Sequence, residues 1–148
     1  MPPANEFLQT FAERRQCIAG LLELSQRQLD LVEADDYSRL LGLLGGKQQI
    51  ISRLEEMGRG RPRLWDEWRQ ERGRLAPDVR QRCEETLAET EDLLARLLEQ
   101  ERISTECLAR RRDDTARELR SVAAGSRVNQ AYGESLAPVT HRFLDRDQ

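Results

Sequence analysis

The second half of this 148-residue chain carries a long heptad repeat, the feature that most constrains its fold. From residue 79 to residue 122, mostly apolar residues recur at alternating steps of four and three, as on one face of a continuous helix. Such a helix is on the order of 70 Å long. We call this row the seam; its members are Val79, Cys83, Leu87, Thr90, Leu94, Leu97, Glu101, Ser104, Leu108, Arg111, Thr115, Leu119 and Val122.

The seam becomes polar in its second half. Four of its positions that a closed bundle would fill with leucine are instead Glu101, Ser104, Arg111 and Thr115. We therefore expect this half to form a less dry core than the first half. We expect this part either to project from the bundle or to stay uncovered until a partner binds.

Two shorter helices are expected before the long one. Residues of about 5–34 and 36–57 both carry apolar side chains at steps of three and four. Between them, Glu33-Ala34-Asp35-Asp36 interrupts the pattern, and either aspartate can cap the second helix. A connection this short predicts antiparallel neighbours.

The sequence thus predicts an all-α fold, in which an antiparallel helical hairpin packs on one long C-terminal helix as a coiled-coil-like three-helix bundle. The bundle would comprise residues 1–124, with an irregular connector at 58–76 before a last helix at about 77–122. Gly125-Ser126 would end that helix and leave 125–148 as a flexible tail. Trp65 and Trp68, within the connector, either cap the open end of the hairpin or form an exposed patch for a partner.

The run Gly45-Gly46-Lys47 raises the question of a phosphate-binding loop. That motif needs a glycine where this chain has Leu41 and a hydroxyl where it has Gln48, and it follows a strand. We therefore place the run inside the second helix. Lys47, the only lysine, falls in the apolar register, so we expect its stem to lie along the stripe and its ammonium to reach water.

Charge and cysteine content argue against several other classes of protein. The net charge is −3 with acidic residues interleaved throughout, so we expect no nucleic-acid partner. Cys17, Cys83 and Cys107 have neither the spacing of a zinc site nor that of a disulfide framework. The chain begins without a signal-peptide pattern and has no apolar run of membrane-spanning length, so we expect a cytoplasmic protein.

No constellation of catalytic residues stands out. The carboxylates are spread as helix-surface charges, and no nucleophile is paired with a base. We therefore expect neither catalysis nor a cofactor or metal.

The second arm DDYSRLLGLLGGKQQIISRLEEM, the long helix and the ending NQAYG together resemble the FlgN family of flagellar type III export chaperones. The resemblance spans most of the chain. It implies a cytosolic chaperone that binds the C-terminal helices of hook-associated junction proteins, prevents their premature assembly and delivers them to the export gate. It also implies that Tyr132 docks at that gate.

Two sets of site residues follow from this interpretation. An amphipathic client helix can bury its apolar face along an incompletely covered helix. The expected client-binding residues on the long helix are Leu94, Leu97, Leu98, Ile103, Leu108 and Leu119. The expected gate-docking residues in the tail are Tyr132, Gly133, Phe143 and Leu144.

Two alternatives stay open. Members of the family often carry asparagines in the middle of the long helix, where this chain has Glu101 and Ser104, so a FliT-like chaperone for the filament cap is a second candidate. From another class, a structural coiled-coil protein could form a homodimer through the same seam.

Overall fold

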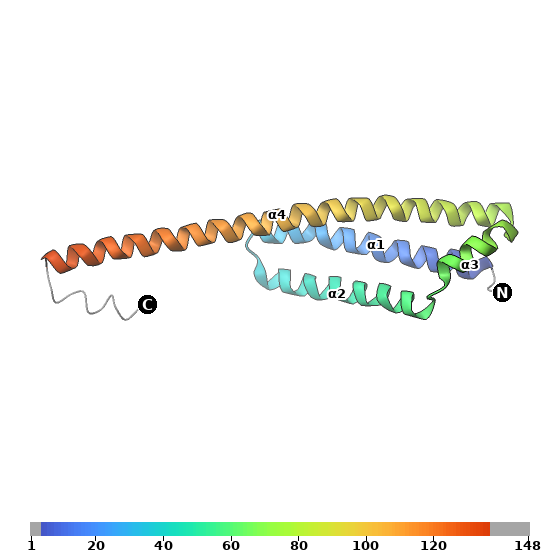
Figure 1. Cartoon of the computed structure of the whole chain (residues 1–148), viewed down its shortest axis with the longest axis horizontal. Coiled ribbons are helices and arrows are strands. Elements are labelled where there is room, and N and C mark those ends of the chain that lie inside the picture. Colours follow the sequence, from blue (N-terminus) through green and yellow to red (C-terminus); the bar gives the residue numbers. More distant parts are fainter. Residues whose placement is uncertain (1–3, 137–148) are drawn as a thin grey trace. The chain divides into compact units, whose positions relative to one another are not determined.

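A computed structural model describes residues 4–136, and every regular element in that part of the chain is helical (Figure 1). The predicted all-α class is therefore confirmed. Residues 1–3 and 137–148, among them the predicted tail residues Phe143 and Leu144, lie outside the described part. The elements in chain order are α1 (Ala4–Glu33), α2 (Tyr37–Gly60), α3 (Leu64–Glu71), the 3₁₀ turn η1 (Arg72–Arg74) and α4 (Pro77–Leu136).

The chain divides into two compact units, residues 1–107 and residues 108–148. The first unit contains α1, α2, α3, η1 and the first part of α4, and it holds both hydrophobic core clusters. The described portion of the second unit is the rest of α4.

The turn between α1 and α2 follows from its two aspartates. Asp35 has φ 55°, in the left-handed region where Asp is one of the few tolerated side chains, and its N–H donates to the Val32 carbonyl. The Asp36 N–H donates to the Leu31 carbonyl, which completes the usual hydrogen-bond pattern of a helix C-terminus. The Asp36 carboxylate then accepts from the Arg39 N–H and caps α2, so Asp36 is the cap of the two candidate aspartates.

One core cluster joins α1, α3 and α4. The Trp68 ring meets Phe7 and Phe11 edge-on, with centroids 5.5 and 5.1 Å apart, and all three residues are buried. Cys83 of α4 completes the buried cluster, with Leu75 and other partly buried side chains around it. Trp68 therefore belongs to the core, one of the two roles considered for the tryptophans.

The second core cluster joins α1, α2 and α4. Ile18, Leu21 and Leu22 of α1 pack with Leu97 of α4, and Ile50, Ile51 and Leu54 of α2 lie against them. α1 and α2 lie side by side (Figure 1), and at Gly20 an added Cβ would stand only 3.3 Å from Ile50 Cδ1. A glycine at this position allows the two helices to approach closely.

Two predicted boundaries differ from the structure. The segment 58–76 is largely helical, because α2 continues to Gly60 and α3 and η1 follow. α4 does not end at Gly125-Ser126 but continues to Leu136. A glycine inside a helix costs only about 1 kcal/mol relative to alanine, and no glycine in the described part adopts the positive φ of a helix stop.

The Gly45-Gly46-Lys47 run lies in the middle of α2, as the sequence predicts. An added Cβ at Gly45 would meet nothing within 4 Å, and one at Gly46 would be in ordinary contact with Leu24. Since α2 is helical on both sides of this run, its backbone N–H groups are used within the helix and not presented as a phosphate cradle.

Candidate interaction surface on helix α4

The part of the seam from Val79 to Ser104 packs into the core. Four of its positions, Cys83, Thr90, Leu97 and Ser104, are buried, and the alternate positions Val79, Leu87, Leu94 and Glu101 are partly buried. The Thr90 hydroxyl donates to the Thr86 carbonyl at 2.7 Å, so this polar group is satisfied within the helix while its methyl group packs. We call this part, Val79 to Ser104, the closed seam, because neighbouring side chains cover it.

Beyond Ser104 the apolar residues of the seam are exposed. Leu108, Leu119 and Val122 are 41, 66 and 70% exposed. At 100° per residue, the seam positions from Leu108 to Val122 fall within an arc of roughly 80° on α4. We call this face the outer seam, defined by Leu108, Arg111, Thr115, Leu119 and Val122.

Val128 provides a reference point on the same helix. Its side chain is 56% exposed. It lies in the part of α4 that extends beyond the predicted helix end. Its position is rotated by roughly 100° to 180° from the members of the outer seam, so it lies outside that face. The sequence interpretation missed it as a helical position because the helix was expected to end at Gly125.

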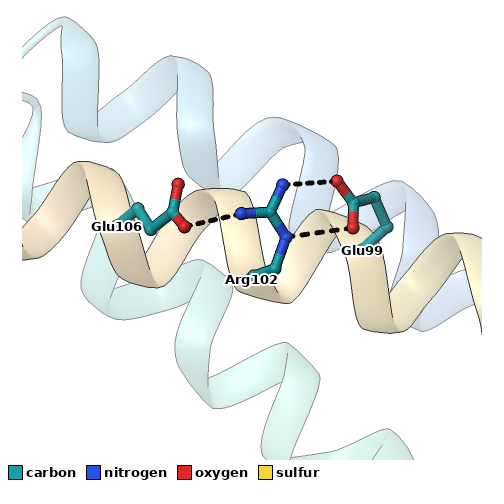
Figure 2. Close-up of polar contacts among 3 residues, drawn as sticks. All are labelled: Glu99, Arg102 and Glu106. Atoms are coloured by element: carbon teal, nitrogen blue, oxygen red, sulfur yellow. Dashed lines mark hydrogen bonds and ion pairs between the residues drawn. The ribbon is translucent and has the colours of Figure 1, made fainter.

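The face of α4 opposite the seam is charged. Arg102 donates two hydrogen bonds to Glu99, at 2.6 and 3.0 Å, and one to Glu106 at 2.5 Å (Figure 2). The hydrogen bond from Arg102 lowers the pKa of the Glu99 carboxyl, and the same bond and the charges of both glutamates raise the pKa of Arg102. These exposed pairs stabilise the helix locally and leave the seam as the apolar face of α4.

A polar cluster connects the three long helices next to the end of the closed seam. Lys47 Nζ donates to Glu101 Oε1 at 2.5 Å and to Gln28 Oε1 at 2.8 Å, and Ser25 Oγ also donates to Glu101. The side chains of Lys47 and Glu101 are 11 and 38% exposed. We call Ser25, Gln28, Lys47 and Glu101 the Lys47 cluster.

The Lys47 cluster corrects two predictions. The ammonium does not extend into water, because Gln28 and Glu101 hold it between the helices. Glu101 is not simply a gap in the seam, because it is the charge partner of Lys47. Burial alone would raise the pKa of the Glu101 carboxyl, but the hydrogen bonds from Lys47 and Ser25 and the charge of Lys47 lower it below its ordinary value.

One further polar atom lies near this end of the closed seam. Ser104, the next seam position after Glu101, is 2% exposed, and its hydroxyl has no hydrogen-bond partner in the described part of the chain. A buried hydroxyl without a partner is unfavourable. The closed seam therefore ends in polar residues, beyond which the outer seam begins.

The predicted client-binding residues differ in how far they are buried. Leu97 is a core residue, and Leu94 packs against the same cluster. Leu98 is exposed but lies to the side of the seam, and Ile103 is partly buried. Only Leu108 and Leu119 of the predicted set lie on the outer seam.

The predicted gate-docking residues are only partly within the described chain. Tyr132 and Gly133 fall in the last turns of α4, although the side chain of Tyr132 is outside the described atoms. Phe143 and Leu144 lie beyond residue 136, as noted above.

Sequence reasoning also missed the α1 partners of Lys47. Ser25 and Gln28 continue the buried row of α1 that contains Ile18, Leu21 and Val32, and both are buried. Polar residues at two successive positions of an apolar row were the available signal, since such groups require partners on the facing helix.

Metal and redox chemistry have few candidate groups in this part of the chain. Within the described residues, no group of three or more His, Cys, Asp or Glu side chains could hold a metal ion. Burial raises the pKa of the Cys17 and Cys83 thiols, which reduces their thiolate fraction at neutral pH.

The helices within residues 4–136 lack the combination of length and apolar character that crossing a membrane requires.

Comparisons of the chain with known protein families, with curated proteins and with solved structures gave no match.

Proposed function

We propose that this protein is a FlgN-like flagellar type III export chaperone, which binds the C-terminal helices of hook-associated junction proteins. One observation carries the proposal. The seam keeps its spacing along α4, but its side chains are buried as far as Ser104 and exposed at Leu108, Leu119 and Val122. An exposed apolar row on a helix is suited to an amphipathic partner helix, whose own apolar face would cover it.

In this proposal the first unit is the scaffold. α1 and α2 act as an antiparallel hairpin packed on the first part of α4, and the two core clusters stabilise that arrangement. The Lys47 cluster lies near the end of the closed seam. Its ion pair forms only when α2 and α4 have the correct register, so the cluster would fix where the closed seam ends. The scaffold thereby leaves the outer seam for the client.

Client binding would rest on few anchors. Leu108, Leu119 and Val122 offer large apolar surface on one face, and burying them against client side chains would supply most of the affinity. The chaperone would thus shield the client's apolar helix face before export. Leu98 and Ile103 would lie at the side of such a contact.

Delivery would use the C-terminal end of the chain. We propose that Tyr132, Gly133, Phe143 and Leu144 dock at the cytosolic domain of the export gate, as the resemblance implies. The proposed role is cytoplasmic and non-catalytic, with no cofactor, metal, nucleic acid or membrane span.

Two competing functions make different predictions for the free protein. A structural coiled-coil protein would pair its own outer seam with that of a second copy, whereas a chaperone would keep it accessible. A FliT-like chaperone would bind the filament-cap protein in place of the junction proteins.

Analytical ultracentrifugation separates these functions. The chain is sedimented alone, with the C-terminal segment of a junction protein, and with that of the filament-cap protein. The proposal predicts a weakly associating or monomeric chain that forms a stable complex with the junction segment. A stable homodimer that binds neither segment would favour the structural role, and a complex with only the cap segment would favour the FliT-like role.

A further inference from the structure

A groove between α1, α2 and α3 lies beside the aromatic core cluster. It has a volume of about 420 Å³, and its apolar lining includes Ile18, Leu54 and Leu64. The Trp65 side chain also lines it, stacked on Phe11 with ring centroids 5.6 Å apart. We call this hollow the Trp65 groove.

Trp65 differs from the other tryptophan in its exposure. Trp68 is buried in the core, whereas Trp65 is 44% exposed even though its ring contacts the same cluster. A rigid, partly exposed tryptophan at the edge of an apolar groove is a common anchor in protein interfaces. Its ring can bury further surface on binding without leaving its position.

The charge of the groove is positive. Its lining contains Arg14 and Arg61 and no carboxylate. Arg61 is partly neutralised, because it donates to Glu67 at 2.9 Å. Arg14 instead lies over the Trp65 ring, 5.3 Å from its centroid, and forms no ion pair within the described part of the chain.

A larger hollow in the same unit has arginines that are neutralised. That hollow has a volume of about 820 Å³ and is also lined by two arginines. There, however, Arg15 pairs with Glu89 at 2.6 Å and Arg53 pairs with Glu13. In a chain of net charge −3, the Trp65 groove therefore presents an uncompensated cation next to apolar surface.

We propose that the Trp65 groove binds an acidic peptide segment that carries one large apolar side chain. The apolar side chain packs against Trp65 and Leu54, and a flanking carboxylate accepts hydrogen bonds from Arg14. A guanidinium already stacked on an aromatic ring loses little further freedom when it binds a carboxylate. This site is built by α1, α2 and α3, so it is separate from the outer seam of α4 and does not depend on the function proposed for it.

The test uses a fluorescein-labelled peptide in which one phenylalanine is flanked on each side by a pair of glutamates. Fluorescence anisotropy measures its affinity for the full chain. We expect saturable binding that weakens on the order of tenfold when the phenylalanine is replaced by alanine or when the protein carries Arg14→Gln. Arg15→Gln, the same change at the adjacent residue, is the matched control and should leave the affinity unchanged.

Two further probes define the partner class. A peptide with lysines in place of the glutamates should not bind, and vesicles of phosphatidylcholine and phosphatidylserine should not retain the protein. Three results would overturn the proposal. They are equal affinity for the glutamate and lysine peptides, no effect of Arg14→Gln on binding of the glutamate peptide, and binding to the vesicles that Arg14→Gln abolishes. Circular dichroism of each variant shows whether a loss of binding reflects a loss of fold.

Discussion

The amine of Lys47, the only lysine in the chain, lies 2.5 Å from the Glu101 carboxylate, which joins α2 to α4 across 54 residues of sequence. A buried cation in an apolar row is costly unless it is paired and hydrogen-bonded, and here Gln28 and Glu101 provide both. The pair therefore fixes the register of α2 against α4, which non-directional apolar contacts alone would define less well.

We predict that Lys47 and Glu101 are energetically coupled. Glu101→Leu should lower the free energy of unfolding by about 2 kcal/mol, at the low end for a broken buried pair because the carboxylate is partly exposed. Lys47→Met combined with Glu101→Leu should recover most of that loss, since no unpaired charge is left. Urea denaturation of the four proteins of this cycle measures the coupling, and simple additivity of the two changes would contradict it.

The same pair predicts a dependence of stability on pH. The pKa of Glu101 is lowered in the folded protein, so its contribution is complete above its ordinary pKa of 4.5 and is lost as the pH falls through the folded value. Other carboxylates titrate in this range, so Glu101→Gln serves as the reference. The difference in unfolding free energy between the wild type and Glu101→Gln should be constant near neutral pH and shrink below about pH 4.5. A difference that grows on acidification would show that the pKa is shifted in the other direction.

A charge should be tolerated differently in the two halves of the seam. Leu97→Asp places a carboxylate in the core and should cost several kcal/mol, whereas Leu108→Asp affects a side chain that is already partly in water and should cost about 1 kcal/mol or less. Thermal melts followed by circular dichroism compare the two variants. Equal losses would mean that Leu108 is covered in solution, for example by a second copy of the chain.

Holding a client and delivering it should be separable. Removal of residues 126–148 leaves the outer seam complete, because that seam ends at Val122, so client binding should be nearly unchanged. The same truncation should abolish docking to the cytosolic domain of the export gate, and Tyr132→Ala alone should reproduce much of the defect, since short motifs concentrate their affinity in one or two aromatic anchors. Parallel pull-downs with a junction-protein segment and with the gate domain measure both properties. Gate binding that survives the truncation would remove Tyr132 from this role.

The positions of the helices could be predicted from the sequence because each depends on local information. Apolar spacing located the three long helices, and Asp36 supplied the cap that begins α2. The predicted end of α4 at Gly125 was wrong, because a single glycine is a weak stop signal when the residues on both sides favour a helix.

The contacts between helices could not be predicted in the same way. The pairing of Lys47 with Glu101 depends on the register of α2 against α4, which apolar spacing alone does not fix. The exposure of Trp65 depends on how α3 lies against α1, and the separation of Leu97 from Leu108 depends on where the core clusters end. The sequence predicted the row of seam residues and its less well packed second half. It did not predict the position of the change, because Glu101 and Ser104 are still covered and exposure begins at Leu108.

The most direct test of the proposed function is to place a charge on the outer seam or outside it and measure client binding. Val122 lies on the outer seam, and Val128 lies outside it, rotated by roughly 120° from Val122. Both are exposed valines on the same helix. Isothermal titration with a peptide of the C-terminal helix of a junction protein should give equal affinities for the wild type and Val128→Asp. Val122→Asp should bind on the order of a hundredfold more weakly. Wild-type affinity in Val122→Asp, or an equal loss in both variants, would contradict the assignment of the outer seam as the client site.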